Sequence, residues 1–91
     1  KSGLLGLTKA SAIDLAKYNI LVNAVSPGFV KTELTKKILS TKESNLLKNS
    51  VPLKRFAEKK EITSLILFLC SNYNTYITGQ NIIIDGGFTI K

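Results

Sequence analysis

Two short and nearly continuous apolar runs constrain the fold of this chain most strongly. Ile20–Val25 and Ile82–Ile84 are rich in β-branched residues, as are strands covered on both faces. Each run follows a helical pattern, the first over Ser2–Lys17 and the second over Glu58–Ser71. Helices that alternate with strands predict an α/β fold with parallel strands. Two strands do not form a stable sheet alone, so we expect the sheet to include strands outside these residues.

The region between the two halves of this pattern has a different character. After Pro27-Gly28 the chain becomes polar and rich in lysine, and Pro52 closes the region. Weak helical patches at Leu34–Leu39 and Glu43–Leu47 interrupt it. We therefore expect a mobile excursion rather than a part of the core.

The net charge of +7 leaves a second class of function open. Nine of the thirteen cationic residues lie between Lys31 and Lys60, which is compatible with a small basic module that binds nucleic acid. The lysines are scattered, however, and Phe56 is the one aromatic residue among them. A coding sequence rich in A and T would also supply abundant lysine, so the nucleic-acid reading is disfavoured.

Several other classes of protein are excluded by composition. Cys70 is the one cysteine and the chain has no histidine, so we expect no internal disulfide, no metal cluster and a cytoplasmic setting. The longest uninterrupted apolar run, Leu65–Cys70, is far shorter than a membrane span. Lys1 enters a helical pattern directly and is not preceded by methionine, which we interpret as a truncation.

Three motifs in fixed order carry the clearest functional signal. They are Asn23-Ala24-Val25-Ser26-Pro27-Gly28-Phe29-Val30-Lys31-Thr32, then Thr78-Gly79-Gln80, then Asp85-Gly86-Gly87. Together they resemble the C-terminal third of a short-chain dehydrogenase/reductase. The resemblance implies the C-terminal part of a Rossmann-type doubly wound parallel sheet, an incomplete domain. Residues 1–91 would be one portion of that single domain, with a substrate lid at about residues 33–51.

The resemblance also assigns roles to individual residues. Lys1 would be the catalytic lysine that favours the phenolate of a tyrosine four positions earlier, and it would also hydrogen-bond the nicotinamide ribose. Pro27 and Gly28 would line the cofactor, and the backbone of Val30 would face the nicotinamide carboxamide. The hydroxyl of Thr32 would reach the cofactor's amide or its phosphates. The catalytic tyrosine and the glycine-rich cofactor loop would lie outside this chain.

The residues themselves support part of this assignment. Pro27 and Gly28 follow the carboxyl end of a predicted strand, where open α/β sheets bind ligands, although an ordinary turn would look the same. Glycine would let a flat ring approach the backbone closely. Asn23 interrupts the apolar run, and we interpret it as a structural link between the strand and adjoining loops rather than a catalytic group.

The function implied by the resemblance is NAD- or NADP-dependent oxidoreduction of a carbonyl or alcohol. Four lid lysines could attract an anionic substrate such as an acyl carrier protein, a coenzyme A ester or a sugar nucleotide: Lys36, Lys37, Lys42 and Lys48. A complete enzyme would be a homo-oligomer, a tetramer or dimer, without membrane association, whereas this chain alone should be inactive. A non-catalytic remnant of such a gene remains the alternative.

Two further features bear on packing and on the lid. Gly3, Gly6 and Ala10 form a stripe on the first predicted helix, which indicates either tight packing on its own sheet or a subunit contact. Ala57 and Lys59 stand where the family usually has glycine and proline, which leaves the geometry of lid closure open.

Overall fold

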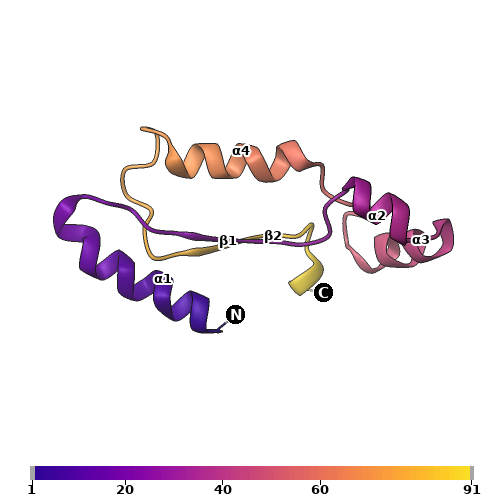
Figure 1. Ribbon diagram of the computed structural model, residues 1–91, viewed down its shortest axis with the longest axis horizontal. Coiled ribbons are helices and arrows are strands. Elements are labelled where there is room, and N and C mark those ends of the chain that lie inside the picture. Colours follow the sequence, from indigo (N-terminus) through magenta and orange to yellow (C-terminus); the bar gives the residue numbers. More distant parts are fainter. Residues whose placement is uncertain (1, 91) are drawn as a thin grey trace. The chain divides into compact units, whose positions relative to one another are not determined.

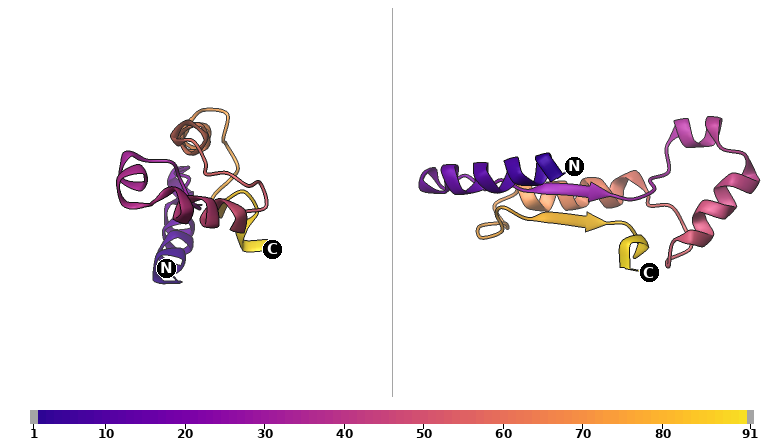
Figure 2. Two further views of the ribbon diagram at one scale, coloured as in Figure 1. Left: turned by 90° about the vertical axis from the view of Figure 1, so that its right-hand side faces the viewer. Right: turned by 90° about the horizontal axis from the view of Figure 1, so that it is seen from below.

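The computed structural model describes residues 2–90. Its elements in chain order are α1 (Ser2–Leu15), η1 (Ala16–Tyr18), β1 (Ala24–Pro27), α2 (Glu33–Ile38), α3 (Thr41–Ser50), α4 (Lys59–Cys70), β2 (Asn81–Ile84) and η2 (Phe88–Ile90). β1 and β2 pair and run in the same direction (Figures 1 and 2), which confirms the predicted α/β class with parallel strands. The chain divides into two compact units, each containing part of both strands.

The first unit combines residues up to Ser26 with Ser64–Ile82. Within it, α1 and the second half of α4 lie on opposite sides of the strands (Figure 1), the arrangement of a doubly wound sheet. Ala12 of α1 is buried, and a Cβ atom added to Gly79 would lie 3.4 Å from the Ala12 Cβ atom. Small residues at both positions therefore let α1 approach the loop that precedes β2.

The connection from α1 to β1 corrects one prediction. Asn19 ends the helical segment in the left-handed conformation, with φ of 59°. The predicted strand at Ile20–Val25 is misplaced, because the ladder begins only at Ala24. Before that point the Val22 N–H donates to the Thr78 hydroxyl at 3.0 Å, and the Gly79 N–H donates to the Val22 carbonyl at 2.6 Å. Residues 20–23 are thus tied to an irregular loop, which a run of apolar residues does not reveal.

The second unit combines Pro27–Thr63 with residues from Ile83 onward. Phe29 lies at its centre, with its ring centroid 6.1 Å from that of Phe56 and 5.2 Å from that of Phe88. Val51 is the most buried residue of this unit, with 2% of its surface exposed. These contacts connect the end of β1, the approach to α4 and the end of β2 around a small aromatic core.

The segment predicted as an excursion contains two short helices with well-defined starts. Thr32 caps α2 and Ser40 caps α3, and each side chain accepts the N–H of the residue three positions later. In both cases the side chain of that later residue accepts the N–H of the cap residue, which completes a capping box. The weak helical patches were therefore correctly located, and local polar side chains supply the order that the apolar pattern lacks.

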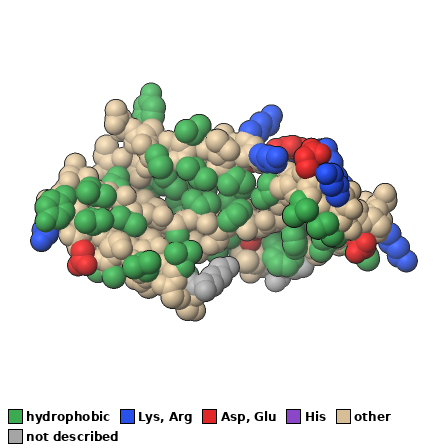
Figure 3. Space-filling model, in the orientation of Figure 1, with side chains coloured by type: hydrophobic (Ala, Val, Ile, Leu, Met, Phe, Trp, Pro, Cys, Tyr) green, Lys and Arg blue, Asp and Glu red, His purple; other side chains and the backbone are tan. Residues whose placement is uncertain are grey.

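Burial is lower than the apolar runs predict. None of the residues of α4 is buried, and Leu67 is 64% exposed. Figure 3 shows hydrophobic side chains gathered over the faces of the strands and α4. The two strands are also only partly covered. Residues 2–90 simply provide too few neighbouring elements to cover these faces.

The small-residue stripe of α1 is open in the structure. A Cβ atom added to Gly3 or Gly6 would meet nothing within 4 Å, so β1 and β2 do not explain these glycines. Packing on further strands of the sheet and a subunit contact both stay predictions.

Two excluded classes of site can be checked in the described part of the chain. None of the helices over residues 2–90 has both the length and the apolar character needed to cross a bilayer. The same residues contain no group of three or more potential metal ligands among histidine, cysteine, aspartate and glutamate.

Candidate functional site

The candidate site begins where β1 ends and is held against the end of β2. The Gly28 N–H donates to the Ile84 carbonyl at 3.0 Å, which extends the strand pairing by one residue. A Cβ atom on Gly28 would lie only 2.8 Å from the Asp85 Cβ atom and 2.9 Å from its Cα atom. The close approach that requires glycine here is therefore made by the neighbouring strand end, a cause that sequence reasoning missed.

Asp85 in turn fixes the turn that follows β2. Its carboxylate accepts the N–H of Gly87 and the N–H of Thr89, both at 3.0 Å. Partial loss of hydration raises the pKa of the Asp85 carboxyl, but hydrogen bonds from Thr89, Gly87 and Phe88 outweigh this effect and lower the pKa overall. Gly86 and Gly87 have positive φ, so the Asp-Gly-Gly sequence is explained by the turn itself.

The N–H and C=O of Val30 point away from its pairing partner, Ala57. It forms an isolated parallel bridge with Ala57. The hydrogen bonds of this bridge run from Ala57 N–H to the Phe29 carbonyl at 2.9 Å and from Lys31 N–H to the Ala57 carbonyl at 2.8 Å. A parallel bridge of this kind does not use the N–H and C=O of Val30, which point the other way. One donor and one acceptor are thus displayed side by side.

Ala57 and Lys59 both fit their local backbone positions. Ala57 replaces the usual glycine, yet its backbone supplies both hydrogen bonds of the bridge with Val30. Lys59 replaces the usual proline and is the first residue of α4. Proline and lysine are both tolerated at a first helical position, so neither departure disrupts the local structure.

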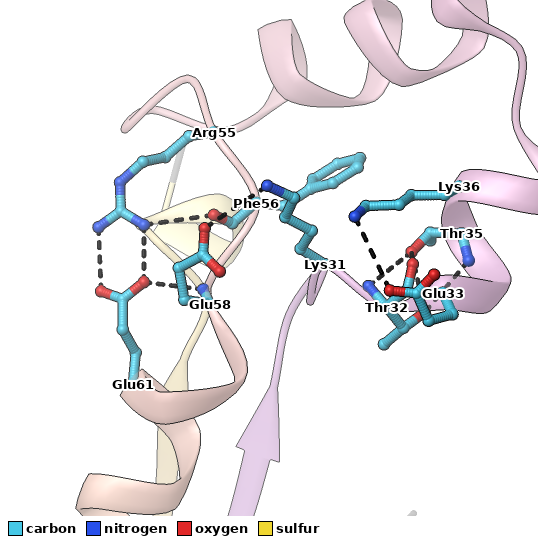
Figure 4. Close-up of polar contacts among 9 residues, drawn as sticks. All are labelled: Lys31, Thr32, Glu33, Thr35, Lys36, Arg55, Phe56, Glu58 and Glu61. Carbon is cyan, nitrogen blue, oxygen red and sulfur yellow. Dashed lines mark hydrogen bonds and ion pairs between the residues drawn. The ribbon is translucent and has the colours of Figure 1, made fainter.

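Thr32 lies two residues after Val30 and starts α2. Its hydroxyl accepts the Thr35 N–H at 3.1 Å and lies 2.8 Å from the Thr35 hydroxyl (Figure 4). The Thr35 hydroxyl accepts the Thr32 N–H at 2.8 Å and donates to the Thr32 carbonyl at 2.7 Å. Because the single Thr35 hydroxyl proton is used there, the proton shared between the two hydroxyls comes from Thr32. The Thr32 oxygen keeps one lone pair for a further donor.

A bidentate ion pair fixes the start of α4 beside this segment. Arg55 donates from Nη1 to Glu61 Oε1 at 2.7 Å and from Nη2 to Glu61 Oε2 at 3.0 Å (Figure 4). Glu61 Oε1 also accepts the Glu58 N–H at 2.8 Å, in the manner of a helix cap. Hydrogen bonding to Arg55, followed by the bond from Glu58, lowers the pKa of Glu61 from 4.5 to about 2.

In the first unit, two asparagines hold the loop before β2. The Asn23 amide donates to the Ile77 carbonyl at 2.9 Å, and its oxygen accepts the Gln80 N–H at 3.1 Å, which confirms its predicted structural role. Asn74 is buried, donates to Leu69 and Ile77, and accepts from the N–H groups of Tyr76 and Ile77. Sequence reasoning missed Asn74, although an asparagine in a turn-rich link is a recognised sign of such a turn.

Four of the five predicted site residues therefore lie on one continuous segment of the second unit. Pro27 is the last residue of β1, and Gly28, Val30 and Thr32 follow it before α2. Lys1, the predicted catalytic lysine, lies outside the described residues. The cofactor roles of all five residues stay predictions at this point.

Parallel strands with helices on both faces, and a loop running from a strand end into a capped helix, are an arrangement of doubly wound α/β proteins. The family described as Enoyl-(Acyl carrier protein) reductase matches residues 1–89. The 3-oxoacyl-(acyl-carrier-protein) reductase FabG of Aquifex aeolicus strain VF5 is 46% identical over 87 residues, which are 96% of this chain and 35% of that protein.

Solved structures agree with this result. A short-chain type dehydrogenase/reductase from Mycobacterium marinum has a TM-score of 0.86 at 41% identity, covering 100% of this chain and 35% of that one. A 4-hydroxyisoleucine dehydrogenase complexed with NADH has a TM-score of 0.89 at 37% identity, covering 99% of this chain and 37% of that one. The chain belongs to the short-chain dehydrogenase/reductase family and spans about a third of the length of the relatives it matches. The fold is part of a Rossmann-type domain, as predicted.

Proposed function

We propose that the protein containing these residues is an NAD- or NADP-dependent oxidoreductase that interconverts a carbonyl and an alcohol. The observation that carries this proposal is the N–H and C=O of Val30, which its bridge with Ala57 does not use, two residues from the Thr32 hydroxyl. It occurs in a chain that matches NADH-bound and reductase relatives over nearly its whole length. The substrate and the full activity belong to the proposal, since the chain spans about a third of those relatives.

The donors and acceptors of the segment fit a nicotinamide carboxamide. A primary carboxamide offers an N–H₂ donor and a C=O acceptor, which match the C=O and N–H of Val30. When bound, the nicotinamide supplies or accepts the hydride of the reaction. Val30 would orient the ring through these two bonds, and Pro27 and Gly28 would border it. Orienting the reacting atoms in this way lowers the entropic part of the barrier.

The hydrogen bonds of Thr32 favour one of the two roles predicted for it. Its proton is directed to Thr35, whereas its oxygen keeps a lone pair. An amide N–H can use that lone pair, but a phosphate oxygen would require a donated proton. We therefore infer that Thr32 accepts a hydrogen bond from the carboxamide rather than donating to the cofactor's phosphates.

The proposal assigns proton transfer to Lys1 and to a tyrosine that would precede it. Lys1 would favour the phenolate of a tyrosine four positions earlier on the same helical face. That tyrosine would exchange a proton with the substrate oxygen, and Lys1 would also hold the nicotinamide ribose. We further propose that residues 1–91 form the C-terminal part of one domain with a lid at about residues 33–51, in a cytoplasmic homo-oligomer.

The first test measures binding and turnover by the natural polypeptide that contains these residues. NADH and NADPH binding would be followed by fluorescence, and carbonyl reduction by loss of nicotinamide absorbance with a panel of ketones and 3-oxoacyl thioesters. Binding and turnover with either cofactor would support the proposal. Binding of neither, by a folded protein, would contradict it and favour the non-catalytic remnant.

A set of Thr32 variants tests the site itself. Thr32→Val removes the acceptor oxygen together with the α2 cap, so we expect cofactor affinity to fall by about tenfold. Thr32→Ser keeps the hydroxyl and should retain both the cap and the affinity. Ser40→Ala, which removes the equivalent cap of α3, is the matched control and should leave cofactor affinity unchanged. Equal affinity for wild type and Thr32→Val would remove Thr32 from the cofactor site.

A further inference from the structure

The second unit contains a hollow of about 220 Å³ between α2, α3 and the residues that lead into α4. We call this the lid hollow. Its wall is strongly cationic, with four basic side chains and one carboxylate. Its lining includes Lys31, Lys36, Lys48, Ser44, Phe56 and Glu58.

The lysines of the lid hollow keep donors for a ligand. The Lys31 ammonium lies 3.8 Å from Glu58, and the Lys36 ammonium lies 3.8 Å from Glu33 (Figure 4). Both distances exceed the range of an N–H···O hydrogen bond, so these are loose, half-exposed ion pairs. The Lys48 ammonium lies 5.5 Å from the centre of the Phe56 ring. Each ammonium carries three N–H donors, so these contacts position the lysines without using up their donors.

Arg55 also borders the lid hollow but plays a different part. Its guanidinium is held by both oxygens of Glu61 and by the Phe56 carbonyl. This fixes the loop that carries Phe56 and Glu58 and leaves ligand binding to the lysines.

The four lid lysines of the sequence now separate into two pairs. Lys36 and Lys48 border the lid hollow, whereas Lys37 and Lys42 do not. Figure 3 shows basic side chains over α2, α3 and the start of α4. Diffuse attraction of an anion would involve all four lysines equally. Binding in the lid hollow would involve only Lys36 and Lys48.

We propose that the lid hollow binds a phosphate or pyrophosphate group carried by the substrate. Its volume is more than ten times the roughly 10–15 Å³ that one water molecule needs, so a polyatomic anion fits. Three ammonium groups and the Ser44 hydroxyl supply donors from three sides, and charge-assisted bonds of this kind suit phosphate oxygens. The assignment of this anion to the substrate rests on the proposed oxidoreductase function, whereas anion binding itself does not.

The test measures pyrophosphate binding to the natural polypeptide by isothermal titration. Lys36→Gln/Lys48→Gln is compared with the matched control Lys37→Gln/Lys42→Gln, which removes the same charge from the same segment. We expect the first pair to weaken binding by about tenfold or more and the control by less than about threefold. Lys36→Arg/Lys48→Arg, which keeps the charge, should retain most of the affinity and shows that the site is intact.

Three results would overturn the proposal. They are an absence of pyrophosphate binding by the folded wild type, equal losses in the two glutamine pairs, and unchanged affinity in both. Equal losses would indicate a diffuse basic surface, of the kind that attracts nucleic acid without a defined site. Saturation with NADH or NADPH separates the two sources of phosphate, because binding that the dinucleotide abolishes belongs to the cofactor and refutes the substrate subsite.

A second arm separates this proposal from the proposed function. With active enzyme, the Lys36→Gln/Lys48→Gln pair should raise KM for a phosphorylated carbonyl substrate by about tenfold and leave KM for an uncharged ketone unchanged. If the enzyme reduces no carbonyl but the titration shows the expected pattern, the oxidoreductase proposal fails while the anion site stands. An unchanged KM for both substrates, with pyrophosphate still bound, refutes the substrate role.

Discussion

Replacing Gly28 by alanine tests whether the strand ends pack as closely as the structure shows. The added methyl carbon would lie 2.8 Å from the Asp85 Cβ atom and 2.9 Å from its Cα atom. Ordinary contacts of a Cβ atom lie at about 3.4–4 Å, so the two strand ends must separate by roughly half an ångström or more. The backbone of Gly28 has no positive φ, so alanine adds a steric contact there without backbone strain.

The size of the effect follows from what holds Asp85 in place. The atoms in the way belong to or adjoin the backbone and cannot rotate aside. Moving them strains the 3.0 Å bond from Gly28 N–H to Ile84 and the turn bonds accepted by the Asp85 carboxylate. Overpacking typically costs about 1–3 kcal/mol, and a weakened hydrogen bond adds about 1 kcal/mol. We expect Gly28→Ala to lower the free energy of unfolding by about 2–3 kcal/mol.

The assay is equilibrium urea unfolding of the natural polypeptide. Unfolding is monitored by circular dichroism and by tyrosine fluorescence. Gly6→Ala is the matched control, because the same methyl group meets nothing within 4 Å there. In a helix interior that change should raise the free energy of unfolding by about 1 kcal/mol. A Gly28→Ala protein within about 0.5 kcal/mol of wild type would refute the packing argument. A loss at Gly6 would instead indicate that another part of the polypeptide or another subunit lies against α1.

Two further changes test the loop before β2 and the start of α4. Asn74→Ala removes the four hydrogen bonds of a buried side chain, so the free energy of unfolding should fall by about 2–3 kcal/mol. Exposed Asn72→Ala should change it little, and equal effects in urea unfolding would contradict this role. The pKa of Glu61 falls from 4.5 to about 2 on folding, so its contribution to stability is complete above pH 4.5 and is lost as the pH falls towards 2. In thermal melts across that range Glu61→Gln should flatten the pH dependence, and an unchanged slope would show that the Arg55 pair does not act on stability.

Much of the fold could be predicted because helices and strands of this chain have distinct apolar periods. α4 and β2 lie close to their predicted ranges. The error at Ile20–Val25 has a physical cause, since β-branched residues also suit an extended loop that hydrogen-bonds to Thr78 and Gly79. Periodicity reports burial and spacing, but it does not report which backbone groups meet.

The site could be predicted as a segment but not in its detail. The Pro-Gly-x-Val-x-Thr pattern located the residues, yet the reason for Gly28 lies in Asp85, more than fifty positions away. The lid hollow was likewise hidden, because Lys31 and Phe56 come together only through the bridge between Val30 and Ala57. Contacts between distant segments decide which of several lysines can act together.

The capping boxes of α2 and α3 have a consequence for how the proposed lid could change. Each helix satisfies its own first N–H groups with Thr32–Thr35 or Ser40–Glu43, independently of the side chains on its outer faces. Exposed Leu34, Ile38 and Leu46 can therefore be exchanged without loss of backbone hydrogen bonds. In the proposed lid, the residues that keep its shape would thus be separate from those that meet new compounds, so its surface could diversify at little cost in folding.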